Sequence, residues 1–228
     1  MRFEDAYRML VKPNDGPISR ALNRRISVRI SIFITEHGAP ISPTDMTVLS
    51  FITAITGAVF FVLNWPLIGG LLAQLASILD GCDGEIARLT GQTSKSGGII
   101  DAILDRVADA ALISALGILA LREPWPYWPE WVHLPQWPLL ALTLTALAIS
   151  GSLVVSYCSA ISRAIASREL KRVVATRDVR LFTIMLSGLV CQWLPWAASA
   201  VLAVLVLMTW ADVANCLAQA AALREEVE

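Results

Sequence analysis

Long apolar runs separated by short polar turns fill the chain from about residue 44 to residue 217. The six runs cover approximately residues 44–63, 67–89, 97–121, 139–160, 179–195 and 196–217. Each has the length of a helix that crosses a bilayer, about 17–25 residues. The pattern therefore predicts an all-α polytopic membrane protein with six transmembrane helices.

The first 43 residues are polar and basic by comparison. Between Ile18 and Ile34, apolar residues alternate irregularly with four arginines, which indicates a basic amphipathic helix on the membrane surface. A solvated helix is the alternative, because some arginines share the apolar face. We therefore expect a cytoplasmic N-terminal segment over residues 1–43, followed by a six-span domain over residues 44–228.

The composition excludes an ordinary soluble domain, since 56% of the residues are hydrophobic and only 16% are charged. The net charge of −1 indicates no particular class of partner. Residues 1–14 contain two acids and no apolar central run, so no cleavable signal peptide is expected. The four cysteines lack metal-type spacing and are interpreted as free core residues: Cys82, Cys158, Cys191 and Cys216.

Four carboxylates interrupt the second and third apolar runs, close to the turn between them. Asp80 and Asp83 are three residues apart and share a helix face, and Asp101 and Asp105 are four apart and share another. Carboxylates within apolar runs are costly unless something neutralises them, and divalent cations with oxygen ligands do so. The spacing indicates a metal centre that can clamp a phosphoryl group. A buried ion-pair network between the two helices is the alternative.

The same stretch carries a longer pattern, D-x2-D-G-x2-A-R-x8-G-x3-D-x3-D, from Asp80 to Asp105. It resembles the signature of the CDP-alcohol phosphotransferases, membrane enzymes that move a substituted phosphate from a CDP-alcohol to a second alcohol and release CMP. The resemblance implies that Asp105 takes the proton from the attacking hydroxyl. It also implies two divalent cations, Mg²⁺ or Mn²⁺, held by Asp80, Asp83, Asp101 and Asp105.

The resemblance extends to the nucleotide. Gly84 and Arg88 match nucleotide-contacting positions of the family, and Ser94 falls where a hydroxyl residue serves the same ligand. Thr44 and Thr47, at the start of the first span, are candidates for contacts with the cytidine. For these two threonines, helix capping is an equally good explanation.

A basic cluster follows the fourth span: Arg163, Arg168, Lys171, Arg172, Arg177 and Arg180. By resemblance, Arg163, Arg177 and Arg180 hold the phosphate of the acceptor, a role that suits the guanidinium fork. The excess of basic residues on the cytoplasmic side of membrane proteins is the other explanation of this cluster.

Charge placement supports the six-span count. With six spans, 17 of the 18 basic residues lie on one side of the membrane, and Arg122 lies alone on the other. The protein is therefore expected in the cell membrane, with both termini and the four aspartates on the cytoplasmic side. Residues 122–138 lie on the opposite side, with four tryptophans and five prolines. They favour an aromatic belt at the interface over a platform for sugars or nucleic acid.

The substrates are indicated by a further resemblance. Residues 12–27 are similar to the start of the subgroup that makes di-myo-inositol phosphate phosphate, which implies CDP-inositol as donor and inositol 1-phosphate as acceptor. That subgroup often carries a cytidylyltransferase domain ahead of this region, and no such domain precedes Met1, so a separate protein is expected to make the CDP-alcohol.

Two other functions remain open. One is a phospholipid synthase of the phosphatidylinositol or archaetidylinositol phosphate type, which uses a CDP-activated lipid. The other is a cation transporter, against which stands the fixed Gly-Ala-Arg pattern that ion passage does not need. The expected partners are membrane lipids and, by family resemblance, a second copy of the chain; nucleic acid is not expected.

Overall fold

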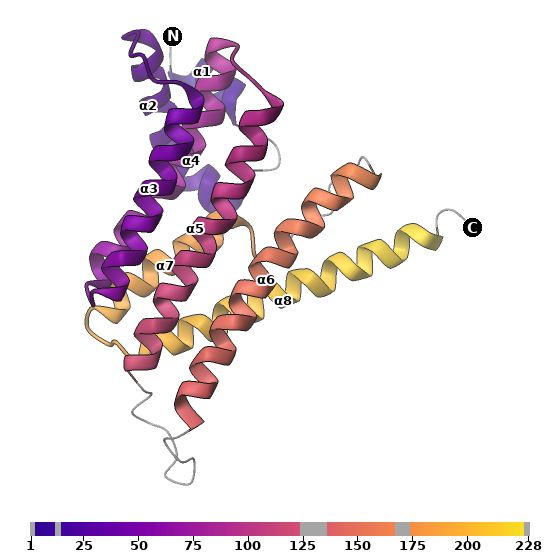
Figure 1. The fold of residues 1–228 in the computed structure, drawn as a ribbon. Helices are drawn as coiled ribbons and strands as arrows, with labels where there is room; N and C mark the ends of the chain where they lie inside the picture. The colour runs from indigo at the N-terminus through magenta and orange to yellow at the C-terminus, as the bar shows by residue number, and fades with distance from the viewer. Residues whose placement is uncertain (1–2, 12–14, 124–135, 167–173, 226–228) are drawn as a thin grey trace.

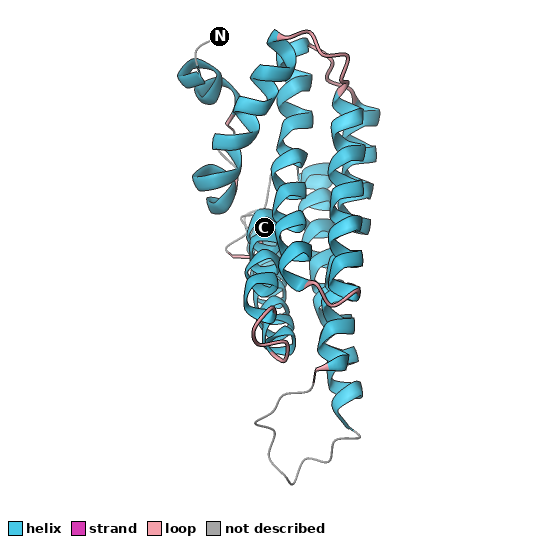
Figure 2. Cartoon of the chain, turned by 90° about the vertical axis from the view of Figure 1, so that its left-hand side faces the viewer, coloured by secondary structure: helices cyan, strands magenta, loops and turns pink. Residues whose placement is uncertain are grey.

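The computed structural model describes residues 3–11, 15–123, 136–166 and 174–225, and within them every regular element is helical. The elements are α1 (Phe3–Leu10), the short π-helix η1 (Ser19–Asn23), α2 (Arg24–Glu36), α3 (Pro43–Val62), α4 (Pro66–Thr90), α5 (Lys95–Arg122), α6 (Trp137–Ala166), α7 (Arg177–Cys191) and α8 (Ala197–Glu225). Figure 2 shows this helical architecture in cyan. The all-α prediction is confirmed, and each of the six apolar runs coincides with one helix from α3 to α8.

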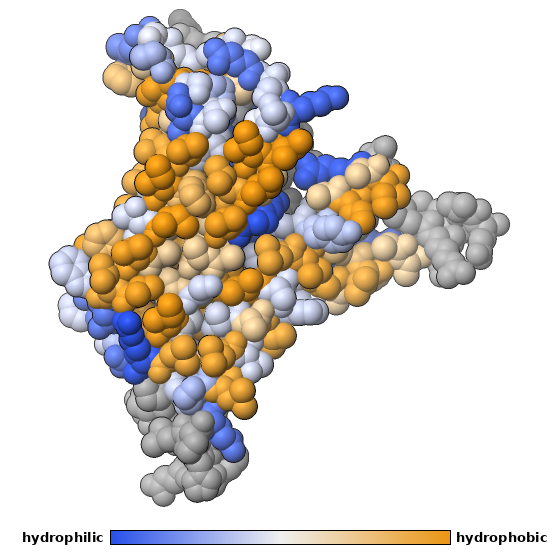
Figure 3. Space-filling view, in the orientation of Figure 1, coloured by the Kyte–Doolittle hydropathy of each residue, from blue (hydrophilic) through white to orange (hydrophobic). Residues whose placement is uncertain are grey.

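Three helices in the described part of the chain, α3, α6 and α8, are long and apolar enough to cross a membrane. Apolar side chains cover much of the visible face, and hydrophilic ones gather at the end that carries α1 and α2 (Figures 1 and 3). The helices fit a membrane protein. Helix α7 has 15 residues, and α4 and α5 include the acidic stretch, so the count of six spans stays a prediction.

The polar turn between α4 and α5 is defined by caps at both sides. Helix α4 ends at Gly91, whose φ of 70° is readily adopted only by residues such as glycine. Helix α5 begins after Ser94, whose hydroxyl accepts a hydrogen bond from the N–H of Gly97 at 3.0 Å. The turn brings the end of α4 beside the start of α5, where the aspartates lie.

Helix α3 begins with a reciprocal cap. The Ser42 hydroxyl accepts from the N–H of Asp45 at 3.2 Å, and the Asp45 carboxylate accepts from the N–H of Ser42 at 2.8 Å. Pro43 occupies the first helical position. Ser42 is thus the capping residue, which leaves Thr44 outside the cap.

Glycines allow α4 to pack directly against the backbone of α7. A Cβ atom on Gly70 would lie 2.8 Å from the carbonyl oxygen of Met185 and 3.0 Å from the Cα of Gly188. Such close approach is typical of small residues between membrane helices. The contact holds α7 beside α4, while α6 and α8 lie side by side and diverge from the α3–α5 group (Figure 1).

The N-terminal helices are attached to α4 by a buried ion pair. Glu85 is 0% exposed and accepts hydrogen bonds from Arg24 at 2.7 Å, Ser27 at 2.7 Å and Ser31 at 2.8 Å. Nε and a terminal nitrogen of Arg24 also donate hydrogen bonds to the two carboxylate oxygens of Asp15, each at 3.0 Å. Burial by itself lowers the pKa of Arg24, but the hydrogen bond and charge of Asp15, with those of Glu85, raise it overall. The guanidinium therefore stays charged at this joint.

Trp137 was expected in an interfacial belt, but it is 6% exposed and donates to the carbonyl of Ala120 at 3.0 Å, so it packs inside the protein. The other three tryptophans of the expected belt, Trp125, Trp128 and Trp131, lie outside the described residues. So do the basic residues Lys12, Arg168, Lys171 and Arg172.

Candidate functional site

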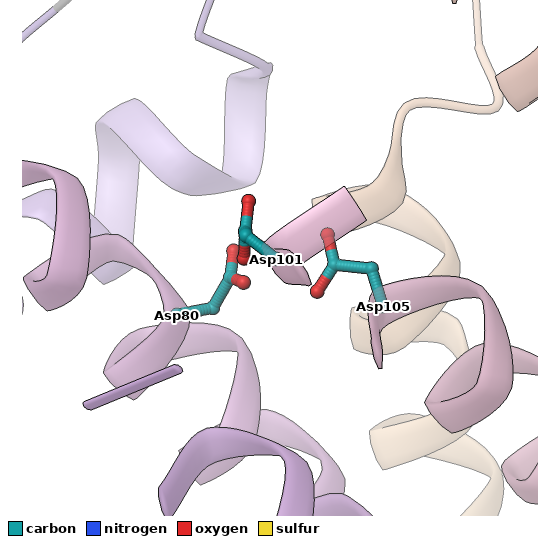
Figure 4. A group of neighbouring side chains, drawn as sticks. All are labelled: Asp80, Asp101 and Asp105. Atoms are coloured by element: carbon teal, nitrogen blue, oxygen red, sulfur yellow. The ribbon is translucent and has the colours of Figure 1, made fainter. Parts of the chain in front are cut away.

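Three of the predicted metal ligands converge. The side chains of Asp80, from α4, and of Asp101 and Asp105, from α5, point toward a common space (Figure 4), and one oxygen from each lies within 4.8 Å of the others. Two buried oxygens, Oδ1 of Asp80 and Oδ1 of Asp101, have no hydrogen-bond partner in the part of the chain that the structure describes. Hard oxygen donors in this number fit Mg²⁺ or Mn²⁺.

Asp83 lies beside this group and is held by a different helix. The Thr47 hydroxyl, on α3, donates to Oδ2 of Asp83 at 2.6 Å, and the N–H of Gly84 donates to the other oxygen. Each carboxylate oxygen has a second lone pair, so Asp83 can keep these hydrogen bonds and still offer a ligand to a cation. The role of Asp83 as a fourth ligand stays a prediction.

Arg177, at the start of α7, links the carboxylates of both helices. One terminal nitrogen lies 2.7 Å from Asp80, and the other lies 2.8 Å from Oδ1 of Asp105. The other Asp105 oxygen faces Arg106 at 3.3 Å. A single guanidinium therefore joins α4, α5 and α7 at the centre of the site.

Asp109 is a fifth acid that the sequence analysis missed. It is 4% exposed and accepts from Nε of Arg177 at 3.3 Å and from Arg180 at 2.7 Å. Its spacing was a usable signal, because Asp109 follows Asp105 by four residues and continues the same face of α5. Asp109 fixes the guanidinium groups of Arg177 and Arg180 relative to the carboxylates.

The other two predicted acceptor residues are placed differently. Arg180 is 2% exposed, and its second terminal nitrogen donates to the carbonyl of Ala175 at 2.8 Å. Arg163 lies on the exposed end of α6, where its Nε donates to the carbonyl of Ser159 at 3.1 Å. Of the three arginines, Arg177 is the one that contacts predicted metal ligands, Asp80 and Asp105, and it also lines the smaller of the two cavities described below.

A cavity of about 350 Å³, here called cavity B, opens between α3, α4 and α5. All five predicted nucleotide-contacting residues line it: Thr44, Thr47, Gly84, Arg88 and Ser94. Asp83 and Asp101 contribute carboxylates to the same wall. Residues predicted from separate parts of the sequence therefore surround one space.

A second cavity of about 170 Å³, here called cavity A, lies between the N-terminal segment, α4 and the start of α7. Its wall is largely polar, with Asp80 and Arg177 from the carboxylate group and Asp15, Asn23 and Arg24 from the N-terminal segment. Asp80 borders cavity A, while Asp83, one helical turn later, borders cavity B. The group of carboxylates therefore borders both cavities.

Known proteins resemble this chain in sequence and in fold. The sequence model of the CDP-alcohol phosphatidyltransferase family matches residues 41–223. A relative from Thermococcus kodakarensis, named bifunctional IPC transferase and DIPP synthase, is 38% identical over 193 residues, which are 79% of this chain and 40% of the relative. The chain therefore spans less than half the length of that relative.

Solved structures share the fold. Phosphatidylinositol phosphate synthase of Mycobacterium tuberculosis, with CDP-DAG bound, superimposes with a TM-score of 0.66 at 22% identity, covering 85% of this chain and 90% of the synthase. The same synthase in complex with manganese and citrate gives a TM-score of 0.64 at 23% identity, covering 84% of this chain and 86% of the synthase. These likenesses establish the arrangement of the helices.

Proposed function

This chain belongs to the CDP-alcohol phosphatidyltransferase family, and from that membership we propose that it transfers a substituted phosphate from a CDP-alcohol to an acceptor hydroxyl and releases CMP. The observation that carries the proposal is the group formed by Asp80, Asp101 and Asp105, in which one oxygen from each carboxylate lies within 4.8 Å of the other two. This group stands where cavity A and cavity B both reach it. Donor and acceptor can therefore meet at one centre.

Cavity B is the proposed site of the CDP moiety, because it is the larger cavity and contains Arg88 and the hydroxyl groups of Thr44, Thr47 and Ser94. Cavity A is the proposed site of a small polar acceptor. The favoured pair is CDP-inositol with inositol 1-phosphate, which would form di-myo-inositol phosphate phosphate. The name of the Thermococcus relative supports this pair.

The chemistry follows from the placement of Asp105 and Arg177. Because Arg177 borders cavity A and contacts Asp105 at 2.8 Å, an acceptor phosphate that binds Arg177 brings the hydroxyl groups of its inositol ring next to that carboxylate. Asp105 is then within reach of the attacking hydroxyl and accepts its proton. Two divalent cations, Mg²⁺ or Mn²⁺, held by Asp80, Asp83, Asp101 and Asp105, would neutralise the charge that develops on the diphosphate and on CMP.

The membrane arrangement completes the proposal. Helices α3 to α8 form six spans of a cell-membrane protein, with both termini and the aspartates on the cytoplasmic side, where nucleotides are available. Helix α2 lies at the membrane surface and presents Ile26 and Phe33, which are exposed, toward lipid. The protein acts as a homodimer, as its family resemblance implies.

A second candidate, a phospholipid synthase, is supported by one finding. The Mycobacterium synthase that shares this fold was solved with CDP-DAG, a lipid-linked donor. A lipid donor would use the same carboxylates and the same cytidine cavity. The two candidates therefore differ in the donor alcohol and in the solubility of the product.

CMP release by the detergent-purified protein tests both candidates. With Mg²⁺, the protein is offered CDP-inositol or CDP-diacylglycerol, each with and without inositol 1-phosphate. CMP release with CDP-inositol that requires inositol 1-phosphate supports the favoured pair. CMP release with CDP-diacylglycerol but not with CDP-inositol supports the second candidate. No release with either donor would contradict both.

The Asp105→Asn variant tests the proposed base. It removes the proton acceptor but keeps the size of the side chain, so turnover should be abolished while nucleotide binding is partly retained. Equilibrium binding of CDP to the variant provides the second measurement. A variant that loses binding but turns over bound substrate normally would contradict the base role of Asp105.

A further inference from the structure

Helix α8 contains one buried carboxylate in its apolar sequence, far along the chain from the signature aspartates. Asp212 is 1% exposed, and its oxygens accept hydrogen bonds from the N–H groups of Val174 at 3.2 Å and of Ala175 at 2.7 Å. A carboxylate at such a position in a membrane helix is costly and usually has a function. Both N–H groups belong to the segment that leads into α7.

The segment that Asp212 contacts directly precedes α7. Residues 174–176 are not helical, so their backbone N–H groups require partners from elsewhere. The N-cap residue Thr176 makes no side-chain capping bond, and the first helical residue is Arg177. The carboxylate of α8 therefore anchors the backbone three residues or fewer before the arginine of the active site.

A continuous set of hydrogen bonds connects this anchor to the carboxylates. The carbonyl of Ala175 accepts from Arg180 at 2.8 Å, and Arg180 donates to Asp109 at 2.7 Å. Asp109 accepts from Nε of Arg177 at 3.3 Å, which aims the two terminal nitrogens of Arg177 at Asp80 and Asp105. Each of these residues is hydrogen-bonded to the next, from Ala175 through Arg180 and Asp109 to Arg177. A shift of the Ala175 backbone would therefore displace the guanidinium of Arg177.

We propose that Asp212 is a positioning residue for Arg177, through which α8 sets the alignment of the acceptor phosphate. This inference rests on the proposed function, in which Arg177 binds that phosphate. A carboxylate that served only to satisfy two backbone N–H groups would affect stability alone. The proposal requires in addition an effect on one substrate and not on the other.

The test compares Asp212→Ala and Asp212→Asn in detergent, using the donor and acceptor pair that supports CMP release. For Asp212→Ala we expect the acceptor KM to rise about tenfold, the effect of losing one charge-assisted hydrogen bond. The donor KM and the half-saturating Mg²⁺ concentration should change by less than about twofold. Asp212→Asn keeps one acceptor oxygen for the Ala175 N–H and should recover part of the acceptor KM.

Thr209→Val provides a matched control. Thr209 lies three residues earlier on α8, is fully buried and bonds the carbonyl of Leu205 in its own helix at 2.8 Å. Valine keeps its shape, so this variant removes a buried polar group from α8 without touching the segment before α7. Its acceptor KM should equal that of the unmodified protein, whatever happens to its melting temperature.

A double variant separates this inference from the proposed function. In an Arg177→Ala background, Asp212→Asn should cause no further rise in the acceptor KM, because both changes act on one contact. If Arg177→Ala raises the acceptor KM but neither Asp212 variant does, or if the two effects add, the role of Asp212 is wrong and the proposed function stands. If Arg177→Ala leaves the acceptor KM unchanged, the acceptor assignment and this inference both fail.

Discussion

At the scale of single residues, the carboxylate of Asp83 depends on a hydroxyl from another helix. The Thr47 hydroxyl donates to it at 2.6 Å, although Thr47 was expected to contact the nucleotide or cap a helix. Thr47 also borders cavity B. One threonine can therefore orient a candidate metal ligand and face the nucleotide at the same time.

Replacing Thr47 by valine should weaken metal binding. The change keeps the side-chain shape but removes the hydrogen bond to Asp83, and loss of such an orienting contact typically lowers metal affinity about tenfold or more. The measurement is the Mg²⁺ concentration that gives half-maximal CMP release. Thr53→Val is the control, since Thr53 is half-buried on the same helix, does not line cavity B and donates to the carbonyl of Leu49 in its own helix. Equal Mg²⁺ requirements in both variants would contradict the role of Thr47.

Arg177 should be more sensitive to substitution than its charge alone suggests. Arg177→Ala is expected to raise the acceptor KM by about tenfold or more, because the proposed contact between the guanidinium and the acceptor phosphate would be lost. Arg177→Lys should recover little of that loss, since an ammonium group cannot bridge two carboxylates and a phosphate in the same geometry. Initial rates at varied acceptor concentration provide the measurement. Full recovery by lysine would show that only charge matters at this position.

The limits of prediction at this scale follow from sequence distance. Asp80, Asp101 and Asp105 could be predicted to converge because they lie on two consecutive helices joined by a short turn. Asp212 could not, because its partners, Val174 and Ala175, are 38 and 37 residues away and are reached only when α8 packs against the start of α7. Spacing within one helix reports shared faces, and it carries no information about which face meets a distant segment.

At the scale of elements, α2 is attached to α4 by charge as well as by apolar contact. Glu85 lies within the signature stretch of α4. Its buried carboxylate accepts hydrogen bonds from Arg24 and from two serines of α2. Since Glu85 lies between Asp83 and Arg88 in the sequence, the N-terminal helices and the metal centre share one segment of α4. Loss of this joint should disturb cavity A, which α2 helps to form.

We expect Glu85→Gln to destabilise the protein by about 3 kcal/mol, because it leaves the partly buried Arg24 without one of its two charged partners. Thermal unfolding in detergent, followed by circular dichroism, measures the loss as a lower Tm. Arg25→Ala removes a neighbouring exposed arginine and should leave Tm unchanged. A Glu85→Gln protein as stable as the Arg25→Ala protein would show that the ion pair contributes little to the docking of α2.

The positions of helices were predictable from the sequence where a long apolar run has the length of one helix. The apolar run over residues 67–89 corresponds to α4 at Pro66–Thr90, and Gly91 ends it with a positive φ. The region before α3 was less predictable, because arginines and apolar residues share faces there. It forms a π-helix, η1, followed by α2, and its shape is determined by contacts with α4 such as that of Arg24 with Glu85.

At the scale of the whole molecule, the site explains why α4 and α5 are absent from the three helices of the described chain that length and composition identify as able to span a membrane. Helices α4 and α5 carry the aspartates and basic residues that the chemistry requires, which lowers their apolar character at one end. The proposed six-span arrangement places these charged ends together on the cytoplasmic side. Residues 91–94 and Asn64 then lie on opposite sides of the membrane.

Cysteine labelling in intact cells tests this arrangement. Asn64 and Ser96 are both exposed, so each can be replaced by cysteine in a Cys158→Ser background, where the other native cysteines are buried. A membrane-impermeant maleimide should label Asn64→Cys from outside, and Ser96→Cys only after permeabilisation. Labelling of both variants from outside would contradict the six-span topology.

The position of the carboxylates between two cavities also has a stereochemical consequence. Asp80 borders cavity A, and Asp83 borders cavity B one turn further along α4. With the CDP-alcohol in one cavity and the acceptor in the other, the hydroxyl approaches phosphorus from the side opposite to the departing CMP. Such a single displacement inverts the configuration at a chirally labelled phosphorus, and it leaves no phosphorylated form of the protein to be trapped.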